Sequence, residues 1–195
     1  MKKELWVALR MTVVTLVLTG IVYPLVITGA ARALFPEASG GSLVKDENGA
    51  VIGSRLIGQP FANPAYLQPR PSAAGANGYD GASSSGSNLG PTSQKLHDRV
   101  KADVERLKQE NPDAGETIPA DLVTASASGL DPHVSPAGAL WQVPRIAKAR
   151  GEDPAVVRAV IEANIEEPTF GILGEPRVNV LAVNLALNRK FGQPH

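Results

Sequence analysis

The sequence predicts an α+β protein in which one N-terminal transmembrane helix precedes a single soluble domain. The run from Met11 to Ala31 has no charged side chain. After it, about 160 residues combine two short β-like runs with several helical patterns, a length that suits one domain. We therefore expect a cytoplasmic N-terminus over residues 1–10, a transmembrane helix over 11–34, and an external domain over 35–195 with a short β-hairpin or small sheet and several helices.

The apolar run has the length that a membrane-spanning helix needs. A helix rising ~1.5 Å per residue crosses about 30 Å of hydrocarbon in roughly 20 residues. Arg10 and Arg32 close the run at its two ends. Pro24 cannot donate to the carbonyl of Gly20, so we expect a kink there. Residues that suit packing against a partner helix also occur in the run: Thr12, Thr15, Thr19 and Gly20.

A cleaved signal peptide is the alternative interpretation of the same stretch. Lys2 and Lys3 begin a positive segment, and Ala31–Ala33 has the small-x-small form of a cleavage site. The apolar run is longer than the ~7–15 residues of a signal core, which favours a retained anchor. In both cases the positive-inside rule places the N-terminus in the cytoplasm and the chain from about Phe35 outside. A mature chain that began at Ala33 or Leu34 would rule out the anchor.

Composition limits the chemistry of the external domain. The chain has no cysteine, which excludes disulfides, thiol nucleophiles and thiolate metal sites. Of the 19 basic and 19 acidic residues, four basic ones and one acidic one precede residue 35, which leaves 15 basic and 18 acidic. This mildly acidic balance does not indicate a partner such as nucleic acid.

The first part of the domain is poor in regular patterns. Ser42–Lys45 and Val51–Ile57 are predicted strands, joined by the turn signal Asn48–Gly49. Residues 58–91 are rich in proline and glycine, and composition alone favours a disordered linker there. Their large side chains favour the opposite, an ordered and functional irregular loop. These side chains are Phe61, Tyr66, Leu67, Tyr79 and Leu89.

The second part is predicted to be mostly helical. We expect a helix over Thr92–Glu110 with an apolar stripe at Leu96, Val100, Val104 and Leu107, then a turn over Pro119–Leu122 and a strand over Leu122–Ala125. A helix capped by Ser135 is expected to run to Arg150 with a core stripe of Leu140, Val143, Ile146 and Ala147, and Pro144 is expected to kink or break it near Leu140. The last expected elements are a helix from Asp153 to Pro168 that buries Val156, Val157, Val160, Ile161 and Ile165, a turn-rich connector over Gly171–Pro176, and a helix from Asn179 to about Arg189.

Three groups of residues are of the types that catalytic or cofactor sites use. Asp131, His133 and Ser135 resemble parts of a hydrolytic set, but the string lacks a nucleophile elbow and is typical of turn and cap chemistry. Ser83–Gly90 is rich in glycine and serine but lacks the lysine of a phosphate loop. Three histidines in the whole chain are too few for a convincing zinc site. We therefore expect no catalytic, cofactor-binding or metal-ligating residue in this chain.

A set of residues outside the regular elements is predicted to contact a partner. Arg70 lies between two prolines, where its guanidinium is expected to pair with a carboxylate or to dock a partner. We expect Arg70→Ala to weaken assembly more than it unfolds the domain. The full set of interface candidates is Phe61, Tyr66, Arg70, Ser87, Asn88, Asp131 and His133.

Several strings together resemble one family. They are Gly58–Phe61 (GQPF), Arg70–Ala73 (RPSA), Gly86–Pro91 (GSNLGP), Val123–Ser126 (VTAS), Ser128–His133 (SGLDPH) and Gly174–Leu181 (GEPRVNVL). With the N-terminal span, they resemble the C chain of the bacterial potassium-transporting P-type ATPase, the Kdp complex, over nearly the whole chain. Pro144 departs from the family, in which an unbroken helix is expected at this point.

The resemblance implies an accessory, non-catalytic subunit that is needed for assembly and activity. Its implied partners are a channel-like potassium-binding subunit, a P-type ATPase subunit, a small accessory membrane subunit and the lipid bilayer. The complex uses ATP, magnesium and potassium, and no cofactor is expected in this chain. The implied location is the bacterial inner or plasma membrane, with a single pass.

Two roles within the complex remain open. In one, the external domain caps the outer mouth of the channel-like subunit. In the other, the chain is a catalytic chaperone that raises the ATP affinity of the ATPase subunit. An external domain cannot touch cytoplasmic ATP, so the second role requires the opposite orientation or coupling through the membrane. A third alternative, from a different functional class, is an exported enzyme tethered by one span.

Overall fold

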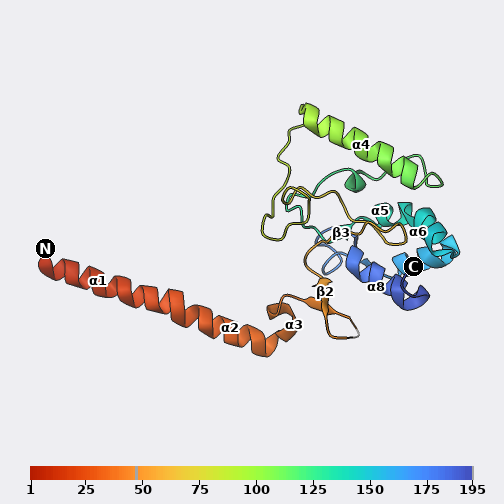
Figure 1. The fold of residues 1–195 in the computed structure, drawn as a ribbon. Helices are drawn as coiled ribbons and strands as arrows, with labels where there is room; N and C mark the ends of the chain where they lie inside the picture. The colour runs from red at the N-terminus through yellow and green to blue at the C-terminus, as the bar shows by residue number, and fades with distance from the viewer. Residues whose placement is uncertain (47, 195) are drawn as a thin grey trace. The chain divides into compact units, whose positions relative to one another are not determined.

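The computed structural model describes residues 1–46 and 48–194, so the last residue of the predicted external domain lies outside the described part. Within this range the chain forms two compact units, residues 1–52 and residues from 53 onward. Helices and small sheets are both present, which confirms the α+β class. Figure 1 shows the course of the chain through each unit.

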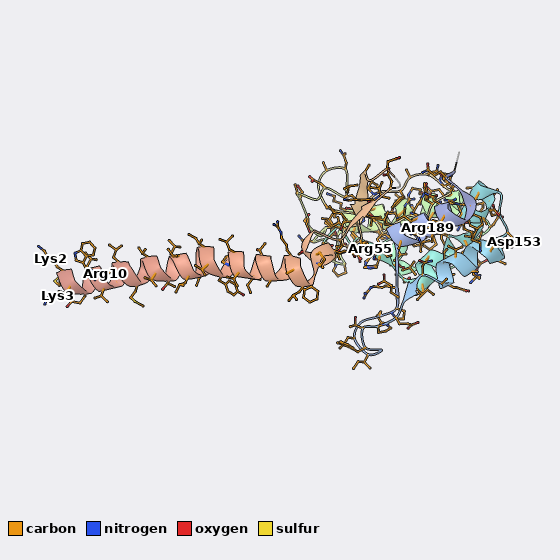
Figure 2. The ribbon with its side chains drawn as sticks, turned by 90° about the horizontal axis from the view of Figure 1, so that it is seen from below. Lys2, Lys3, Arg10, Arg55, Asp153 and Arg189 are labelled. Atoms are coloured by element: carbon orange, nitrogen blue, oxygen red, sulfur yellow. The ribbon has the colours of Figure 1, made fainter. Side chains whose placement is uncertain are left out.

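The first unit begins with one continuous helical rod. It consists of α1 (Lys2–Val17), the π-helical segment η1 (Leu18–Val22) and α2 (Tyr23–Leu34). The rod is 33 residues long, apolar enough to cross a membrane, and no residue in its most apolar window is buried by the protein. Figure 2 shows its side chains pointing outward all round, with Lys2, Lys3 and Arg10 at the N-terminal end. The helix therefore starts nine residues before the predicted apolar run, because the charged N-terminal segment is helical too.

Pro24 interrupts the regular α-helical hydrogen bonding of this rod. The residues before it form η1, where the N–H of Tyr23 donates to the carbonyl of Leu18, five residues back. A π-type turn is a known way to accommodate a backbone group that a proline leaves unpaired. Threonine hydroxyls also bond to carbonyls in the preceding turns, Thr12 to Ala8 at 2.9 Å and Thr19 to Thr15 at 2.8 Å.

The predicted hairpin follows the rod. After the short helix α3 (Pro36–Ser39), strands β1 (Leu43–Lys45) and β2 (Val51–Ser54) pair as a two-stranded sheet. At its turn the carboxylate of Asp46 accepts hydrogen bonds from the N–H groups of Asn48 and Ala50, at 2.9 and 2.8 Å. β2 ends three residues earlier than the predicted strand, because the chain turns at Ser54–Ile57.

The second unit contains most of the helices. In chain order its elements are α4 (Gln94–Glu110), the 3-10 turn η2 (Ala120–Leu122), β3 (His133–Val134), α5 (Pro136–Trp141), α6 (Val143–Arg150), α7 (Pro154–Glu162), β4 (Ile165–Glu166), β5 (Arg177–Asn179) and α8 (Val180–Phe191).

A three-stranded sheet in this unit was not predicted. Its strands lie in the order β3-β5-β4, and both pairs are antiparallel. Val178 of β5 lies opposite Val134 and Ile165, so the central strand joins two distant parts of the chain. The predicted helix to Pro168 was wrong in its end, since α7 stops at Glu162 and the chain enters β4. Strands of two or three residues leave almost no periodic signal in a sequence.

The predicted strand over Leu122–Ala125 was also wrong. Leu122 closes the 3-10 turn η2, and the N–H of Val123 donates to the carbonyl of Ala120. The hydroxyl of Thr124 donates to the same carbonyl at 2.7 Å. These local bonds occupy groups that a strand would need, and a β-branched run therefore forms a turn here.

Three predicted helix starts are confirmed in atomic detail. Ser135 accepts from the N–H of Gly138, Asp153 from that of Ala155, and Asn179 from that of Ala182. Figure 2 labels Asp153 at one end of the unit. These side chains satisfy backbone donors that have no partner inside the helix.

The predicted break caused by Pro144 is confirmed. It separates α5 from α6 at Gln142, and Gly151 ends α6 in the left-handed conformation with φ of 68°. Pro144 thereby lies in the first turn of a new helix, where its missing N–H removes no bond.

The hydrophobic core forms where α5, α6, α7, α8 and the sheet meet. Several predicted core positions are correct, but Leu140, Val156 and Ile165 are only half-buried. Ala139 of α5 is fully buried in the core. Helix α4 lies at the edge of the unit in Figure 1 and contributes only Leu107 as a buried residue. The other stripe residues of α4, from Leu96 to Val104, are half-buried. The core residues are Leu67, Leu107, Leu122, Val123, Val134, Ala139, Val143, Ile146, Ala147, Val157, Val160, Ile161, Val178, Val180, Val183 and Leu187.

Candidate partner-binding surface

The long irregular segment is ordered because side chains of the helices bond to its backbone. No helix or strand occurs between Ile57 and Gln94 in the described chain. Leu67 is nevertheless fully buried in the core. Its N–H donates to the side chain of Asn184 at 2.7 Å, and its carbonyl accepts from the same amide at 2.9 Å. The prediction of an ordered loop is confirmed, and the disordered linker was the wrong alternative.

The backbone of Gln68 is also held by two hydrogen bonds with one buried side chain. Its N–H donates to Gln142 at 2.9 Å and its carbonyl accepts from Gln142 at 3.0 Å. Both Gln142 and Asn184 are almost completely buried. A carboxamide offers one oxygen acceptor and two N–H donors. It can therefore bond both the N–H and the carbonyl of a residue, as a neighbouring strand would in a sheet.

Two arginines of α6 complete this anchorage. Arg145 donates to the carbonyls of Pro64 and Tyr66, at 2.6 and 3.1 Å, and to the side chain of Gln142 at 2.6 Å. Burial lowers the pKa of Arg145 to about 10, which still leaves it charged at neutral pH. Arg150 donates to the carbonyl of Ala65 at 2.7 Å.

The predicted interface residues Phe61 and Tyr66 lie on this anchored segment. Their rings contact one another, with centroids 5.6 Å apart. The guanidinium of Arg150 lies over the Tyr66 ring at 5.2 Å, and the Tyr66 hydroxyl accepts from Asn188 at 3.0 Å. Both aromatic residues are half-buried, so only part of each side chain is accessible at the surface.

Three further candidates form one polar cluster. Arg70 Nη1 lies 3.0 Å from Asp131 Oδ2, and the other oxygen of Asp131 lies 3.4 Å from His133 Nδ1. Asp131 also accepts from the N–H of His133 at 3.0 Å, which is the turn chemistry that the sequence indicates. Arg70 therefore pairs with a carboxylate, one of the two roles expected of it.

The cluster extends to residues that the sequence did not single out. His133 Nε2 lies 3.9 Å from Glu166, and Glu166 pairs with Arg177 at 3.0 Å. The sheet brings them together, because β5 lies between β3 and β4. Since the sheet was not predicted, no sequence signal pointed to Glu166 or Arg177 beyond the place of Arg177 in the string GEPRVNVL.

Electrostatics stabilise the charged form of Asp131. Burial would raise the pKa of Asp131, but hydrogen bonds from His133 and the charge of Arg70 outweigh it and lower that pKa. The neighbouring Tyr79 behaves oppositely: burial, with the charge of Asp131 added, raises the pKa of its hydroxyl. That hydroxyl donates to the carbonyl of Arg70. Arg70, Asp131 and Tyr79 thus place a guanidinium, an ionised carboxylate and a protonated phenol beside one another at neutral pH.

The Arg70–Asp131 pair lines two hollows. One of about 310 Å³ is lined by this pair together with His133 and Arg177, and another of about 480 Å³ by the same pair and residues 125–128. A third, of about 580 Å³, lies between Trp141 and the start of α7 and contains none of the predicted candidates.

The remaining two interface candidates are Ser87 and Asn88. In the part of the chain that the structure describes, no hydrogen bond joins either residue to Arg70, Asp131 or His133. Asn88 is exposed and has a positive φ of 50°. The neighbouring serines bond to backbone carbonyls, since Ser85 donates to that of Ala73 in the same segment and Ser84 to that of Ser128 outside it.

Ser135 is also separate from His133 in its bonding. Its hydroxyl donates to Asp121 at 3.1 Å and accepts from the N–H of Gly138 at 2.9 Å. The serine is therefore a helix cap, and the hydrolytic set that the string suggested is not assembled as a proton relay.

The connector predicted over Gly171–Pro176 is part of an exposed apolar loop, although the exposure of its apolar side chains was not predicted. It joins β4 to β5 and exposes Phe170, Ile172 and Leu173 at 88%, 81% and 57%. Figure 2 shows this loop, in blue, projecting from its unit. The available signal was the string TFGILG, in which large apolar residues stand between glycines.

Comparisons with known proteins agree on one family. Residues 5–189 match the family described as "K+-transporting ATPase, c chain". The chain is 62% identical to the potassium-transporting ATPase KdpC subunit of Myxococcus xanthus, with 95% of this chain and 87% of the relative covered. It is 57% identical to the KdpC subunit of Caulobacter sp. strain K31 (90% and 88% covered) and 54% identical to that of Koribacter versatilis (96% and 95% covered). The resemblance in the motifs is thereby confirmed, and the chain belongs to the KdpC family, the c chains of K+-transporting ATPases.

Proposed function

We propose that this chain is an accessory subunit of an ATP-driven potassium uptake complex, needed for assembly and activity and without an active site of its own. The observation that carries the proposal is the family match over residues 5–189. The bare apolar rod supports it, because a helix with no buried residue needs lipid or partner helices around it. The proposed partners are the channel-like potassium-binding subunit, the P-type ATPase subunit and a small accessory membrane subunit.

The proposed topology has the N-terminus in the cytoplasm and the domain outside. Lys2, Lys3 and Arg10 precede the apolar stretch, while Arg32 alone follows it closely. This asymmetry supports the orientation through the positive-inside rule. A reporter at the C-terminus, active only outside the membrane, tests it: signal from a cytoplasmic reporter would contradict the orientation.

Within the complex, we assign the external domain to the outer mouth of the potassium-selecting subunit. The Arg70–Asp131–His133 cluster and its two hollows supply a surface with fixed charges, which suits recognition of a partner. The small acidic excess of the domain agrees with a place beside a cation entrance. Any effect on ATP use is then indirect, through a conformational equilibrium shared with the other subunits.

The experiment has two readouts on the full chain in mild detergent. The tagged chain should retain the other membrane subunits on purification, and complex prepared without it should show altered potassium dependence of ATP hydrolysis. Calorimetric titration of the full chain with ATP should show no binding. Saturable binding at micromolar ATP would instead favour the catalytic-chaperone role, and failure to retain any subunit would favour a tethered exported enzyme.

A further inference from the structure

The loop between β4 and β5 combines a fixed backbone with apolar side chains in water. Thr169 and Leu173 exchange two backbone hydrogen bonds of 2.9 and 3.0 Å, and Gly171 donates to Pro168 at 2.8 Å. The antiparallel strands at its base, β4 and β5, hold its two ends. A loop with this many internal bonds has a defined shape, so its exposed side chains are presented in one arrangement.

The backbone at the tip of the loop has a strained conformation. Phe170 has a positive φ of 56°, a conformation that bulky residues rarely adopt. Its side chain is 88% exposed, so no packing within this unit compensates for the strain. Backbone strain that the rest of the structure maintains is common where a segment contacts a ligand or partner. Phe170 is therefore placed for a contact outside this chain.

The charges beside the loop indicate the kind of partner. Glu166 and Glu167 precede it, Glu175 follows it, and Arg177 is the one nearby cation in the sequence. Arg177 is already paired with Glu166. Glu167 and Glu175 are exposed and form no ion pair within the described residues. Two such carboxylates beside the apolar tip would be repelled by an anionic lipid surface, but they suit an apolar pocket with lysine or arginine at its rim.

We propose that the Thr169–Leu173 loop is a docking element that inserts Phe170 and Ile172 into an apolar pocket with a basic rim on a partner subunit. The inference rests on the proposed function, since it requires such a subunit. Large apolar side chains that fill a pocket are the usual energetic centre of an interface, while rim charges mainly set orientation and association rate. Phe170 and Ile172 thus contribute most of the binding free energy. Glu167 and Glu175 make the binding depend on salt concentration.

Cross-linking tests the contact directly. The chain has no cysteine, so F170C gives it a single site for a benzophenone label, which is attached before the full complex is assembled. Photolysis should join this chain to another protein subunit, and the same label at E105C, on the exposed face of α4, should give little product. A product with lipid in place of protein would overturn the proposal and identify a membrane contact, and so would no product above the E105C level.

Affinity measurements provide the second arm. The double variant Phe170→Ser/Ile172→Ser should weaken retention of the partner subunits about 30-fold, the effect of losing one interface hot spot. Glu167→Gln/Glu175→Gln should weaken it about 3-fold at low salt and less at high salt, with Glu105→Gln as the matched charge control. If the wild-type chain retains its partners and the Ser variants retain them equally well, this inference fails while the proposed function stands. If the wild-type chain retains none, the proposed function fails.

Discussion

Two irregular segments of the same unit use their side chains in opposite ways. Residues 58–91 bring Leu67 into the core, and their backbone is bonded by side chains from distant helices. The β4–β5 loop bonds its backbone to itself and exposes Phe170 and Ile172. Both segments are rich in proline and glycine. In these two segments, backbone bonds to distant side chains accompany burial of an apolar residue, whereas bonds within the loop accompany its exposure.

The largest effect should come from removing an anchor of the long segment. Asn184→Ala leaves both the N–H and the carbonyl of Leu67 buried without partners. Since each orphaned group costs about 1–3 kcal/mol, the free energy of unfolding should fall by about 3 kcal/mol. Urea denaturation of the full chain in detergent, followed by circular dichroism, measures this.

A matched control uses another asparagine. Within the described residues, the side chain of Asn164 donates only to the carbonyl of Val160, four residues back near the end of α7. Asn164→Ala should therefore cost less than about 1 kcal/mol. Equal losses for the two variants would show that the long segment does not depend on its anchors.

A pair of glycines provides a second comparison of the two segments. A Cβ on Gly129 would lie 2.6 Å from the Ser85 carbonyl oxygen and 2.7 Å from the Ala74 nitrogen, whereas a Cβ on Gly171 meets nothing within 4 Å. Both have positive φ, so each Gly→Ala change costs about 1 kcal/mol in backbone strain. Gly129→Ala should cost about 2 kcal/mol in total because of the added clash. Thermal unfolding compares the stability of the two variants. A larger loss of stability for Gly171→Ala than for Gly129→Ala would contradict the close packing of Gly129 against Ser85 and Ala74.

The polar cluster beside the long segment should give a smaller, pH-dependent effect. The lowered pKa of Asp131 means that its stabilising contribution is present above the unfolded value, near 3.9, and is lost as pH falls through the folded value. Asp131→Asn should thus cost about 1 kcal/mol at neutral pH, with a difference from wild type that shrinks in acid below about pH 4. Urea midpoints measured from pH 7 to pH 3 check this, and a difference that grew in acid would be the wrong sign.

The smallest effect on stability is expected at the exposed loop. Phe170→Ser/Ile172→Ser removes side chains that are already in water, so the free energy of unfolding should change by no more than about 0.5 kcal/mol. The measurement is the same urea titration used for Asn184→Ala. A loss above about 2 kcal/mol would mean that these side chains support the fold of the unit, as buried groups do.

Local features were the most predictable part of the fold. The apolar helix, the caps at Ser135, Asp153 and Asn179 and the break caused by Pro144 all depend on neighbours within a few residues. The three-stranded sheet was missed, and Leu122–Ala125 was mistaken for a strand, because short strands acquire their pairing from distant segments. The cluster residues Glu166 and Arg177 were missed for the same reason.

By itself, the sequence determined the class, the apolar helix and the family, because length, hydropathy and motif order are written along the chain. It also identified Arg70, Asp131 and His133 as residues worth attention. Only the tertiary structure decided that Arg70 pairs with Asp131, that Gln142 and Asn184 order the long segment, and that Phe170 remains in water. Those outcomes depend on which groups meet across the fold, since a buried polar group needs a partner that local sequence does not specify.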